Sequence, residues 1–323
     1  MYHKKILILH SSSATHLGLF NDIKEEPNVI ILEARQKKLR FKWLSKIHLS
    51  PKLNLPYKYL QYNYSDIPTS EIKVALVMGT ALEDIDYSYL SKIKRKGGIV
   101  ILYLIDSLGA SSPKIQYCKN KINLFQWDHI YTFDAKDARK FNYQYLGFNY
   151  YSKHLIPIIN NPPNDIYFVG GLKGNRTNLV YQTYKYFINN GLKTDYNVMK
   201  YHNQEDLYME NLEGINYITN GWVPYHYVLT GLANSKCLIE ILQEGQHGPS
   251  LRYFEAVCYN KKLLTNNPLI VNYPYYNPFH MRIFNHISDI DLEWLRRDDV
   301  VNYNYKEDFS PINLISFINK LLH

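Results

Sequence analysis

Short apolar runs alternate with longer amphipathic or polar stretches along the first half of the chain. Such an alternation is typical of parallel strands joined by crossover helices. Residues 99–105, IVILYLI, are apolar without interruption, which indicates a central strand covered on both faces. The predicted strands of this half are Lys5–Leu9, Val29–Leu32, Val74–Met78, Ile99–Ile105 and His129–Phe133. The first half is therefore predicted to form one doubly wound α/β domain.

The alternation resumes after a break rich in proline and asparagine. Residues 150–165, YYSKHLIPIINNPPND, carry Pro157, Pro162 and Pro163, which interrupt any periodicity and indicate a linker. The predicted elements beyond it are strands Asp165–Val169, Tyr196–Tyr201, Ile215–Thr219, Lys236–Leu242 and Lys262–Thr265, and helices Thr177–Asn190, Tyr225–Ala233 and Ser250–Tyr259. The expected fold class is thus α/β, with two Rossmann-like doubly wound domains facing across a cleft.

The domain boundaries follow from this break and from the last apolar pattern of the chain. Residues 1–155 are predicted to form the N-terminal Rossmann-like domain, and residues 156–308 the second one. Within residues 309–323, the pair Ser310-Pro311 is followed by apolar residues at helical spacing. This pattern predicts a C-terminal helix that packs back on the domains.

Composition narrows the class of protein. Of the 323 residues, 46% are hydrophobic and 20% are charged, as in folded globular proteins, and no apolar run reaches the roughly 18 residues of a membrane span. Ile6–Leu9 is too short for a signal peptide, so we expect a cytoplasmic protein. Cys118, Cys237 and Cys258 form no C-x-x-C pair, which argues against a disulfide framework or a zinc site. The net charge of +8 predicts an anionic partner.

A glycine-rich turn, GGLKGNR at 170–176, leads from a predicted strand into a predicted helix. Glycines let backbone N–H groups and a helix N-terminus approach a phosphate, to which Lys173 and Arg176 add positive charge. We therefore interpret Gly171, Lys173 and Arg176 as parts of a pyrophosphate site. The alternative, that the glycines serve only packing and chain reversal, stays open.

A second glycine loop, EGQHGPS at 244–250, also leads from a buried strand into a predicted helix. Pro249 and Ser250 are suited to a helix start. Arg252 and Glu255 are three residues apart and therefore share one face near the positive end of that helix. This arrangement predicts Arg252 and the loop amides on a diphosphate and Glu255 on ribose hydroxyls. The alternative is an ordinary surface ion pair between Arg252 and Glu255.

At this loop the sequence resembles a known family. Residues 237–267, CLIEILQEGQHGPSLRYFEAVCYNKKLLTNN, look like the donor-site segment of GT-B glycosyltransferases, especially those of bacterial capsule and lipopolysaccharide clusters. Residues 127–146, WDHIYTFDAKDARKFNYQYL, look like the last strand and helix of their N-terminal domain, and residues 168–180, FVGGLKGNRTNLV, resemble the opening of their donor domain. Over the first 120 residues only the α/β alternation is similar.

The resemblance implies a role for several positions. It places Glu255 on the donor ribose, Arg176 and Arg252 near the diphosphate, and the Gly248–Ser250 amides on the phosphates. The predicted donor-binding residues are Gly171, Lys173, Arg176, Gln246, Gly248, Pro249, Ser250, Arg252 and Glu255. Many such enzymes have a further glutamate eight positions before the last of these. Here that position is His247, so the acidic partner of the sugar is missing or displaced to Glu244.

The function implied by the resemblance is transfer of a sugar from a nucleotide-diphosphate donor to a growing bacterial surface glycan, capsule or lipopolysaccharide. Residues 1–155 would then bind the acceptor, a glycan or lipid-linked glycan, and residues 156–308 the nucleotide sugar. We expect no cofactor and no metal, because the D-x-D patterns at 84–86 and 289–291 are interpreted as helix caps. Two alternatives stay open: a nucleotide-sugar 2-epimerase on the same fold, and a non-catalytic basic glycan-binding protein.

The acceptor half offers two candidate catalytic bases at the ends of predicted strands. His10 ends the first strand, and Asp106 follows the strand at 99–105. Either residue has suitable chemistry to take the proton of an acceptor hydroxyl in an inverting reaction. Histidine and aspartate also commonly cap the helix after a strand, and a retaining enzyme would need no such base. Both alternatives stay open.

A strongly basic segment, Glu33–Lys52, predicts a contact with membrane. It carries seven cations and no acid after Glu33, with Leu39, Trp43 and Ile47 at every fourth position. A helix with this apolar stripe and basic flank suits insertion at an anionic membrane surface. We therefore predict peripheral contact through Arg35–Lys52 at the inner face of the cell membrane. No nucleic-acid partner is predicted, because no such motif accompanies the charge. A solvated structural helix is the alternative.

Overall fold

The computed structural model describes residues 5–12, 18–34, 36–39, 60–62, 64–109, 119–157, 159–174, 176–200, 212–218 and 223–322. The chain divides into two compact units. Unit 1 consists of residues 1–108, 112–152 and 310–323, and unit 2 of residues 109–111 and 153–309. Helix α10 (Pro311–Lys320) therefore belongs to unit 1, although it follows unit 2 in the sequence.

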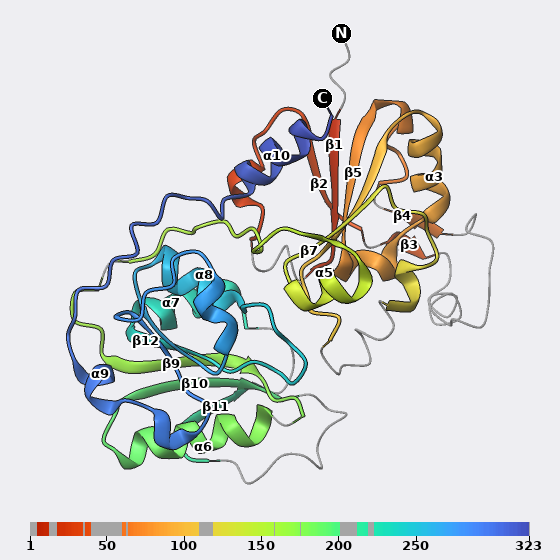
Figure 1. Ribbon diagram of the computed structural model, residues 1–323. Coiled ribbons are helices and arrows are strands. Elements are labelled where there is room, and N and C mark those ends of the chain that lie inside the picture. The colour runs from red at the N-terminus through yellow and green to blue at the C-terminus, as the bar shows by residue number, and fades with distance from the viewer. Residues whose placement is uncertain are drawn as a thin grey trace. The chain divides into compact units, whose positions relative to one another are not determined.

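Unit 1 is built on a parallel sheet of six strands (Figure 1). Their order is β2 (Val29–Glu33), β1 (Lys5–His10), β5 (Ile72–Met78), β6 (Ile99–Leu104), β7 (His129–Thr132) and β8 (Gln144–Tyr145). The connections contain α3 (Tyr87–Arg95), α5 (Ala135–Phe141), and the 3-10 turns η1 (Asn21–Ile23), η3 (Thr69–Glu71) and η4 (Gly79–Asp84). Since β2 lies on one side of β1 and the later strands lie on the other, the strand order reverses between β1 and β5.

The core of unit 1 lies between this sheet and its helices. Strands β5 and β6 are buried along most of their length, which confirms that the uninterrupted apolar run is a central strand. Leu90 and Ile93 of α3 pack into the same core. Helix α3 begins after Asp86, whose carboxylate accepts the Ser88 N–H at 2.8 Å. The predicted capping role of the first D-x-D pattern is thereby confirmed for Asp86.

Unit 2 also contains a parallel sheet of six strands. Their order is β11 (Ile215–Ile218), β10 (Thr194–Met199), β9 (Asn164–Gly171), β12 (Ser235–Glu240), β13 (Lys262–Thr265) and β14 (Met281–Ile283). The helices are α6 (Arg176–Asn189), α7 (Tyr225–Ala233), α8 (Leu251–Cys258) and α9 (Leu292–Arg296), with 3-10 turns η6 (Pro268–Asn272) and η7 (Ile287–Asp289). The strand order is that of the Rossmann fold and reverses between β9 and β12.

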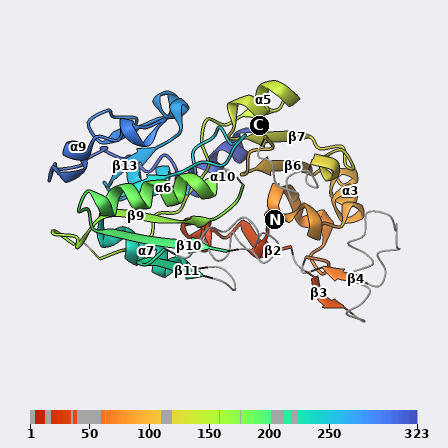
Figure 2. The ribbon, with the colours of Figure 1, turned by 90° about the horizontal axis from the view of Figure 1, so that it is seen from below.

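Alternate residues of β9 supply the two faces of this second sheet. Ile166 and Phe168 pack in one cluster with Phe187 of α6. Tyr167 lies on the opposite face, where a Cβ at Gly231 of α7 would come within 2.3 Å of its ring. Gly231 thus lets α7 approach the sheet closely. Figures 1 and 2 show α6 on one face of the sheet and α7 on the other.

The two sheets and their flanking helices confirm the predicted α/β class with two Rossmann-like domains. The expected helix in the basic segment is wrong at its start. Gln36–Leu39 forms strand β3, which pairs antiparallel with β4 (Leu60–Tyr62). Pairing with a distant segment has overridden the local helical spacing here. Arg35 and residues 40–52 lie outside the described residues.

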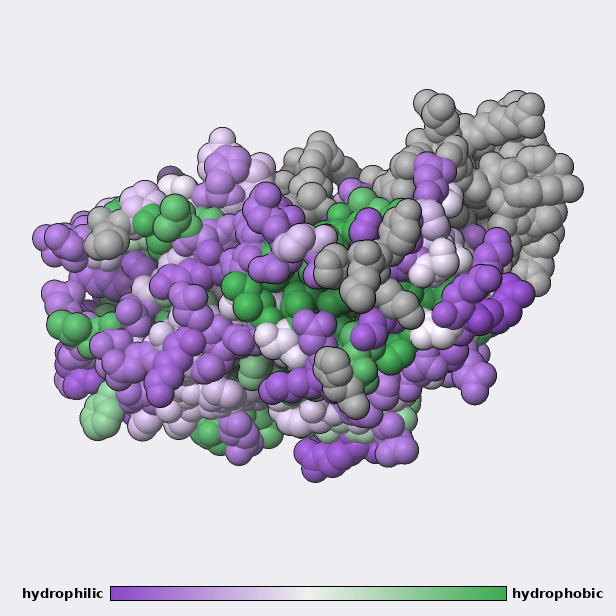
Figure 3. Space-filling model, turned by 90° about the horizontal axis from the view of Figure 1, so that it is seen from above, coloured by the Kyte–Doolittle hydropathy of each residue, from purple (hydrophilic) through white to green (hydrophobic). Residues whose placement is uncertain are grey.

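Polar side chains cover most of the surface of the described residues on the face shown in Figure 3. This distribution is expected when apolar residues pack between sheets and helices. In the part of the chain that the structure describes, none of the helices combines the length and the apolar character of a bilayer span.

Candidate functional site

The two glycine-rich segments meet at the carboxyl edge of the sheet in unit 2. The turn at 172–175 follows β9, and the loop at 241–250 follows β12. Strands β9 and β12 are parallel neighbours, and the strand order reverses between them. In doubly wound sheets, ligands bind in the crevice outside such a reversal point. The two glycine-rich segments therefore follow neighbouring strands at one edge of the sheet.

Arg176 connects the two segments. It is the first residue of α6, and its guanidinium donates to the carbonyl oxygens of Gly171 and, at 3.3 Å, of Ile241. These acceptors stand at the ends of β9 and β12, so one side chain joins both strand ends. Lys173 is half-buried in the same turn, and Gly174 has a left-handed φ of 51°. Arg176 thus lies at the carboxyl edge of the sheet, with backbone oxygens among its partners.

Hydrogen bonds to other groups of the protein fix the loop before α8. The Ser250 hydroxyl caps the helix by accepting the Arg252 N–H at 3.2 Å. The Ser250 N–H donates to Glu240 Oε1 at 2.6 Å, and Gln246 Nε2 donates to the Gly248 carbonyl at 3.3 Å. The expectation that the Gly248–Ser250 amides meet a phosphate therefore needs correction. The Ser250 N–H has a protein partner, and Pro249, at the middle position, has no N–H to donate.

Arg252 and Glu255 form a buried ion pair, so the alternative of an ordinary surface pair is wrong. Glu255 is 0% exposed and Arg252 is 8% exposed. Two guanidinium nitrogens lie 2.7 Å and 2.8 Å from the two carboxylate oxygens, and the Tyr225 hydroxyl donates to Glu255 at 2.8 Å. Burial raises the pKa of Glu255, whereas Arg252 and Tyr225 favour its ionised form. The Glu255 carboxylate, predicted to meet the ribose, is engaged by these two side chains.

His10 lies at the corresponding reversal point of unit 1, at the end of β1 beside β5. It is buried, and its Nδ1 donates to the Ser11 carbonyl at 2.8 Å. A carbonyl oxygen only accepts, so Nδ1 carries a proton in this contact. Burial lowers the pKa of His10, although the Glu33 carboxylate, paired with it in strand register, acts in the opposite direction. A lowered pKa favours the neutral ring, which is the form that a base requires.

Asp106 lies elsewhere along the same edge. It is exposed and follows β6, which is separated from β1 by β5. Two strand spacings amount to about 10 Å. The structure thus brings His10 and Asp106 to one edge of the sheet but not to adjacent strands, and each is a separate candidate for the base.

A buried acidic cluster that sequence reasoning missed stands beside Asp106. The Ser107 hydroxyl donates to Asp134 at 2.5 Å, and the Leu108 N–H donates to Asp137 at 2.5 Å. Asp134 also caps α5. Burial raises the pKa of Asp137 to about 6, more than the Leu108 N–H lowers it. The only signal in the sequence was the aspartate before a predicted helix, which accounts for capping but not for a contact with the loop after β6.

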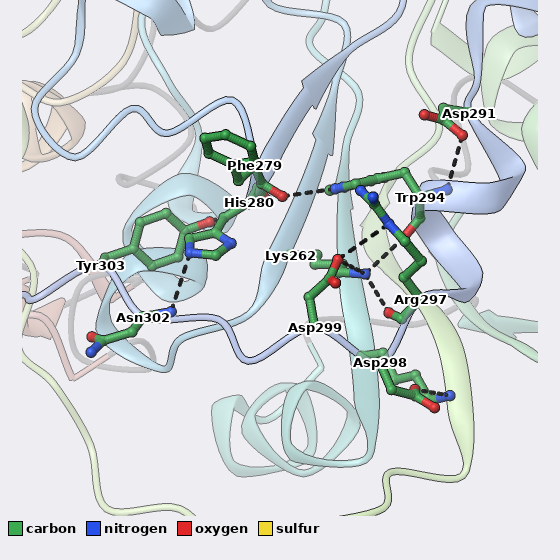
Figure 4. A network of polar contacts seen from close by, with 11 residues as sticks. Lys262, Phe279, His280, Asp291, Trp294, Arg297, Asp298, Asp299, Asn302 and Tyr303 are labelled. Atoms are coloured by element: carbon green, nitrogen blue, oxygen red, sulfur yellow. Dashed lines mark hydrogen bonds and ion pairs between the residues drawn. The ribbon is translucent and has the colours of Figure 1, made fainter.

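A second polar network lies at the amino end of β13, away from the carboxyl edge that carries the glycine loops (Figure 4). Lys262 Nζ donates to the carbonyls of Trp294 and Arg297 at 2.7 Å and 2.5 Å and pairs with Asp299 at 3.2 Å. The Trp294 indole donates to the Phe279 carbonyl at 2.9 Å. These contacts attach the segment around α9 to the sheet, so we interpret this network as structural.

The second D-x-D pattern also caps helices, as predicted. Asp289 takes part in the capping box of η7, and Asp291 accepts the Trp294 N–H at 2.9 Å. Among the residues placed by the structure, no three histidine, cysteine, aspartate or glutamate side chains are grouped as metal ligands.

Comparisons with known proteins give structural likeness only. No family model and no curated protein matches the chain. Among solved structures it is similar to the glycotransferase of kitacinnamycin, with a TM-score of 0.46 and 11% identity over 99% of this chain and 98% of the other. It is also similar to spinosyn rhamnosyltransferase SpnG complexed with spinosyn aglycone, with a TM-score of 0.36 and 10% identity over 81% of this chain and 80% of the other. A third similar structure is MurG of Acinetobacter baumannii, with a TM-score of 0.32 and 8% identity over 90% of this chain and 88% of the other. At these values, function has to be inferred from the chain's own residues.

Proposed function

We propose that this protein is a glycosyltransferase that moves a sugar from a nucleoside-diphosphate donor, bound by unit 2, to an acceptor hydroxyl. The observation that supports this most is the convergence of two glycine-rich segments where the strand order of unit 2 reverses. Both segments lead into helix N-termini, of α6 and α8, whose partial positive charge favours phosphate oxygens. Nucleotide binding is the function that such a site performs in doubly wound sheets.

The leaving diphosphate would be stabilised by charge fixed in advance. Lys173, in the turn between β9 and α6, supplies a flexible ammonium, and Arg252 supplies a guanidinium near the start of α8. Glu255 holds the Arg252 side chain in place through two contacts. Preorganised positive groups of this kind lower the barrier to departure of an anionic leaving group. The proposal includes no metal and no cofactor.

The base is assigned to His10 and the acceptor to unit 1. The lone pair of His10 Nε2 would take the proton of the acceptor hydroxyl as the new glycosidic bond forms. Asp106 is the alternative base. We propose a bacterial surface glycan of the capsule or lipopolysaccharide type as acceptor, free or lipid-linked, because residues 237–267 resemble transferases of those clusters. A cytoplasmic position, with Arg35–Lys52 against the anionic inner face of the membrane, belongs to the same proposal.

A panel of nucleotide sugars tests the function directly. We expect one or more nucleoside diphosphates or their sugars to raise the Tm of the protein through preferential binding to the folded state. The best donor is then incubated with and without glycan acceptor, and release of nucleoside diphosphate is followed. Acceptor-dependent release is the expected result. Absence of protection by every nucleoside diphosphate would contradict the proposal, and a free epimeric nucleotide sugar formed without acceptor would indicate an epimerase.

A further inference from the structure

Glu240 carries a buried carboxylate. It is the last residue of β12, is 1% exposed, and lies between the buried residues Ile239 and Ile241. An ionised carboxylate in such a place is costly unless hydrogen bonds compensate for the lost water. Burial raises the pKa of Glu240, whereas its contacts with Thr265 and Ser250 and the charge of Arg252 favour the ionised form. The hydrogen-bond partners of Glu240 therefore indicate its role.

The two carboxylate oxygens of Glu240 contact two different elements. Oε1 accepts the Ser250 N–H at 2.6 Å, at the start of α8. Oε2 accepts the Thr265 hydroxyl at 2.5 Å, at the end of β13. The Thr265 oxygen in turn accepts the Asn267 N–H at 3.0 Å, so its own proton is directed to Glu240. One side chain thus joins the ends of two strands to the first turn of a helix.

This junction determines where Arg252 stands. Ser250, which Glu240 holds through its N–H, caps α8 by accepting the Arg252 N–H. Further along the helix, Glu255 fixes the guanidinium. We propose that Glu240 is a positioning residue of the donor site: its carboxylate holds the first turn of α8 against β12 and β13 and thereby places Arg252 for the donor diphosphate. The proposal rests on the function proposed above.

Three variants of the full-length chain test the role. Glu240→Ala removes both hydrogen bonds and leaves the Ser250 N–H without its partner. Glu240→Gln keeps an oxygen for this N–H and an amide that can donate to the Thr265 oxygen. Glu293→Ala, on α9, removes an exposed carboxylate of the same type in the same unit and is the matched control.

Binding of UDP and dTDP is measured by calorimetry, and donor and acceptor KM and kcat by a release assay. For Glu240→Ala we expect about 10- to 100-fold weaker binding of the better nucleoside diphosphate and a similar rise in donor KM, with acceptor KM unchanged. Glu240→Gln should stay within about threefold of the wild type, as should Glu293→Ala. Hydrogen exchange should accelerate in the peptide 243–255 of Glu240→Ala and not of Glu240→Gln.

If Glu240 only stabilised the fold, Glu240→Ala would give a different result. Loss of folded protein would lower its apparent kcat and leave Kd and KM unchanged. That outcome, or equal weakening in Glu240→Ala and Glu240→Gln, would overturn the proposal. If Glu240→Ala does not fold, Glu240→Asp, which withdraws the carboxylate by one methylene, is expected to weaken donor binding in the same direction. A wild-type protein that binds neither diphosphate nor any nucleotide sugar would instead refute the function itself, and this inference with it.

Discussion

The two units share a parallel six-stranded sheet but use its reversal point differently. In unit 2 the reversal lies between β9 and β12, and both strands lead into glycine-rich segments that end at the helices α6 and α8. In unit 1 it lies between β1 and β5, and β1 ends in a buried histidine, His10, whose Nδ1 donates to the Ser11 carbonyl. Under the proposed function, the same architecture would provide an anion site in one unit and a proton acceptor in the other. Chemistry resides in the loops and not in the sheet.

Buried carboxylates secure the loops in both units, but they do so under different electrostatic conditions. Glu240 of unit 2 has a backbone N–H, a hydroxyl and the charge of Arg252 in its favour. Asp137 of unit 1 accepts the Leu108 N–H and has the like charge of Asp134 nearby. Burial outweighs the favourable contacts in both units, so the pKa of each carboxylate is raised, but only Asp137 has a like charge among the causes.

Among the predicted changes, removal of His10 is expected to have the largest effect, and the effect is on catalysis. His10→Ala is expected to lower kcat by about 100- to 10,000-fold, the usual contribution of a general base. The Kd of the nucleoside diphosphate should not change, because unit 2 is untouched. Wild-type kcat should fall in acid as the ring takes up a proton, at a pH below the ordinary histidine pKa since burial lowers it.

Asp106→Ala is the parallel experiment for the other candidate base. A loss of comparable size in this variant, with His10→Ala near the wild type, would move the base to the end of β6. A small loss in both would point to a retaining enzyme, which needs no base. Single-turnover rates and calorimetric Kd values for both variants distinguish these outcomes.

The buried ion pair of unit 2 is expected to show the next largest effect. Arg252→Met leaves Glu255 without its counter-charge and should lower the free energy of unfolding of unit 2 by about 3–5 kcal/mol. The double variant Arg252→Met/Glu255→Leu should recover a large part of this loss, because no uncompensated charge remains. Urea denaturation, with hydrogen exchange of the α8 peptide, measures both. Equal losses in the single and double variants would show that the pair contributes through packing alone.

Most of the architecture could be predicted from the sequence, because each strand and helix has its own local pattern of apolar and polar residues. Helix Tyr225–Ala233 and strand Lys262–Thr265 have the predicted bounds, and the meeting of the two glycine segments follows from strand order. The partners of individual side chains could not be predicted in this way. Glu240 meets Thr265 because β12 and β13 are neighbours in a given register, which no local pattern specifies. The pairing of β3 with β4 was missed for the same physical reason.

The smallest expected effect concerns the electrostatic difference between the two units and is tested at Asp137. Its pKa is about 6 in the folded protein and about 3.8 when unfolded, so the folded state binds more protons between these values. Its contribution to stability is therefore full below about pH 4 and is lost as the pH rises through 6. Asp137→Asn removes this loss and keeps an oxygen for the Leu108 N–H. Relative to the wild type it should gain roughly 1–3 kcal/mol between pH 4 and pH 7.5.

Hydrogen exchange of the β7 peptide, compared between variant and wild type at each pH, measures this difference because intrinsic exchange rates cancel. Glu25→Gln, an exposed carboxylate of the same unit, is the control and should give parallel curves. If the pH dependence of stability in Asp137→Asn is also parallel to that of the wild type, Asp137 titrates as a solvated carboxyl does. Burial and the charge of Asp134 would then not raise the pKa of Asp137, and the electrostatic contrast drawn between Glu240 and Asp137 would have to be given up.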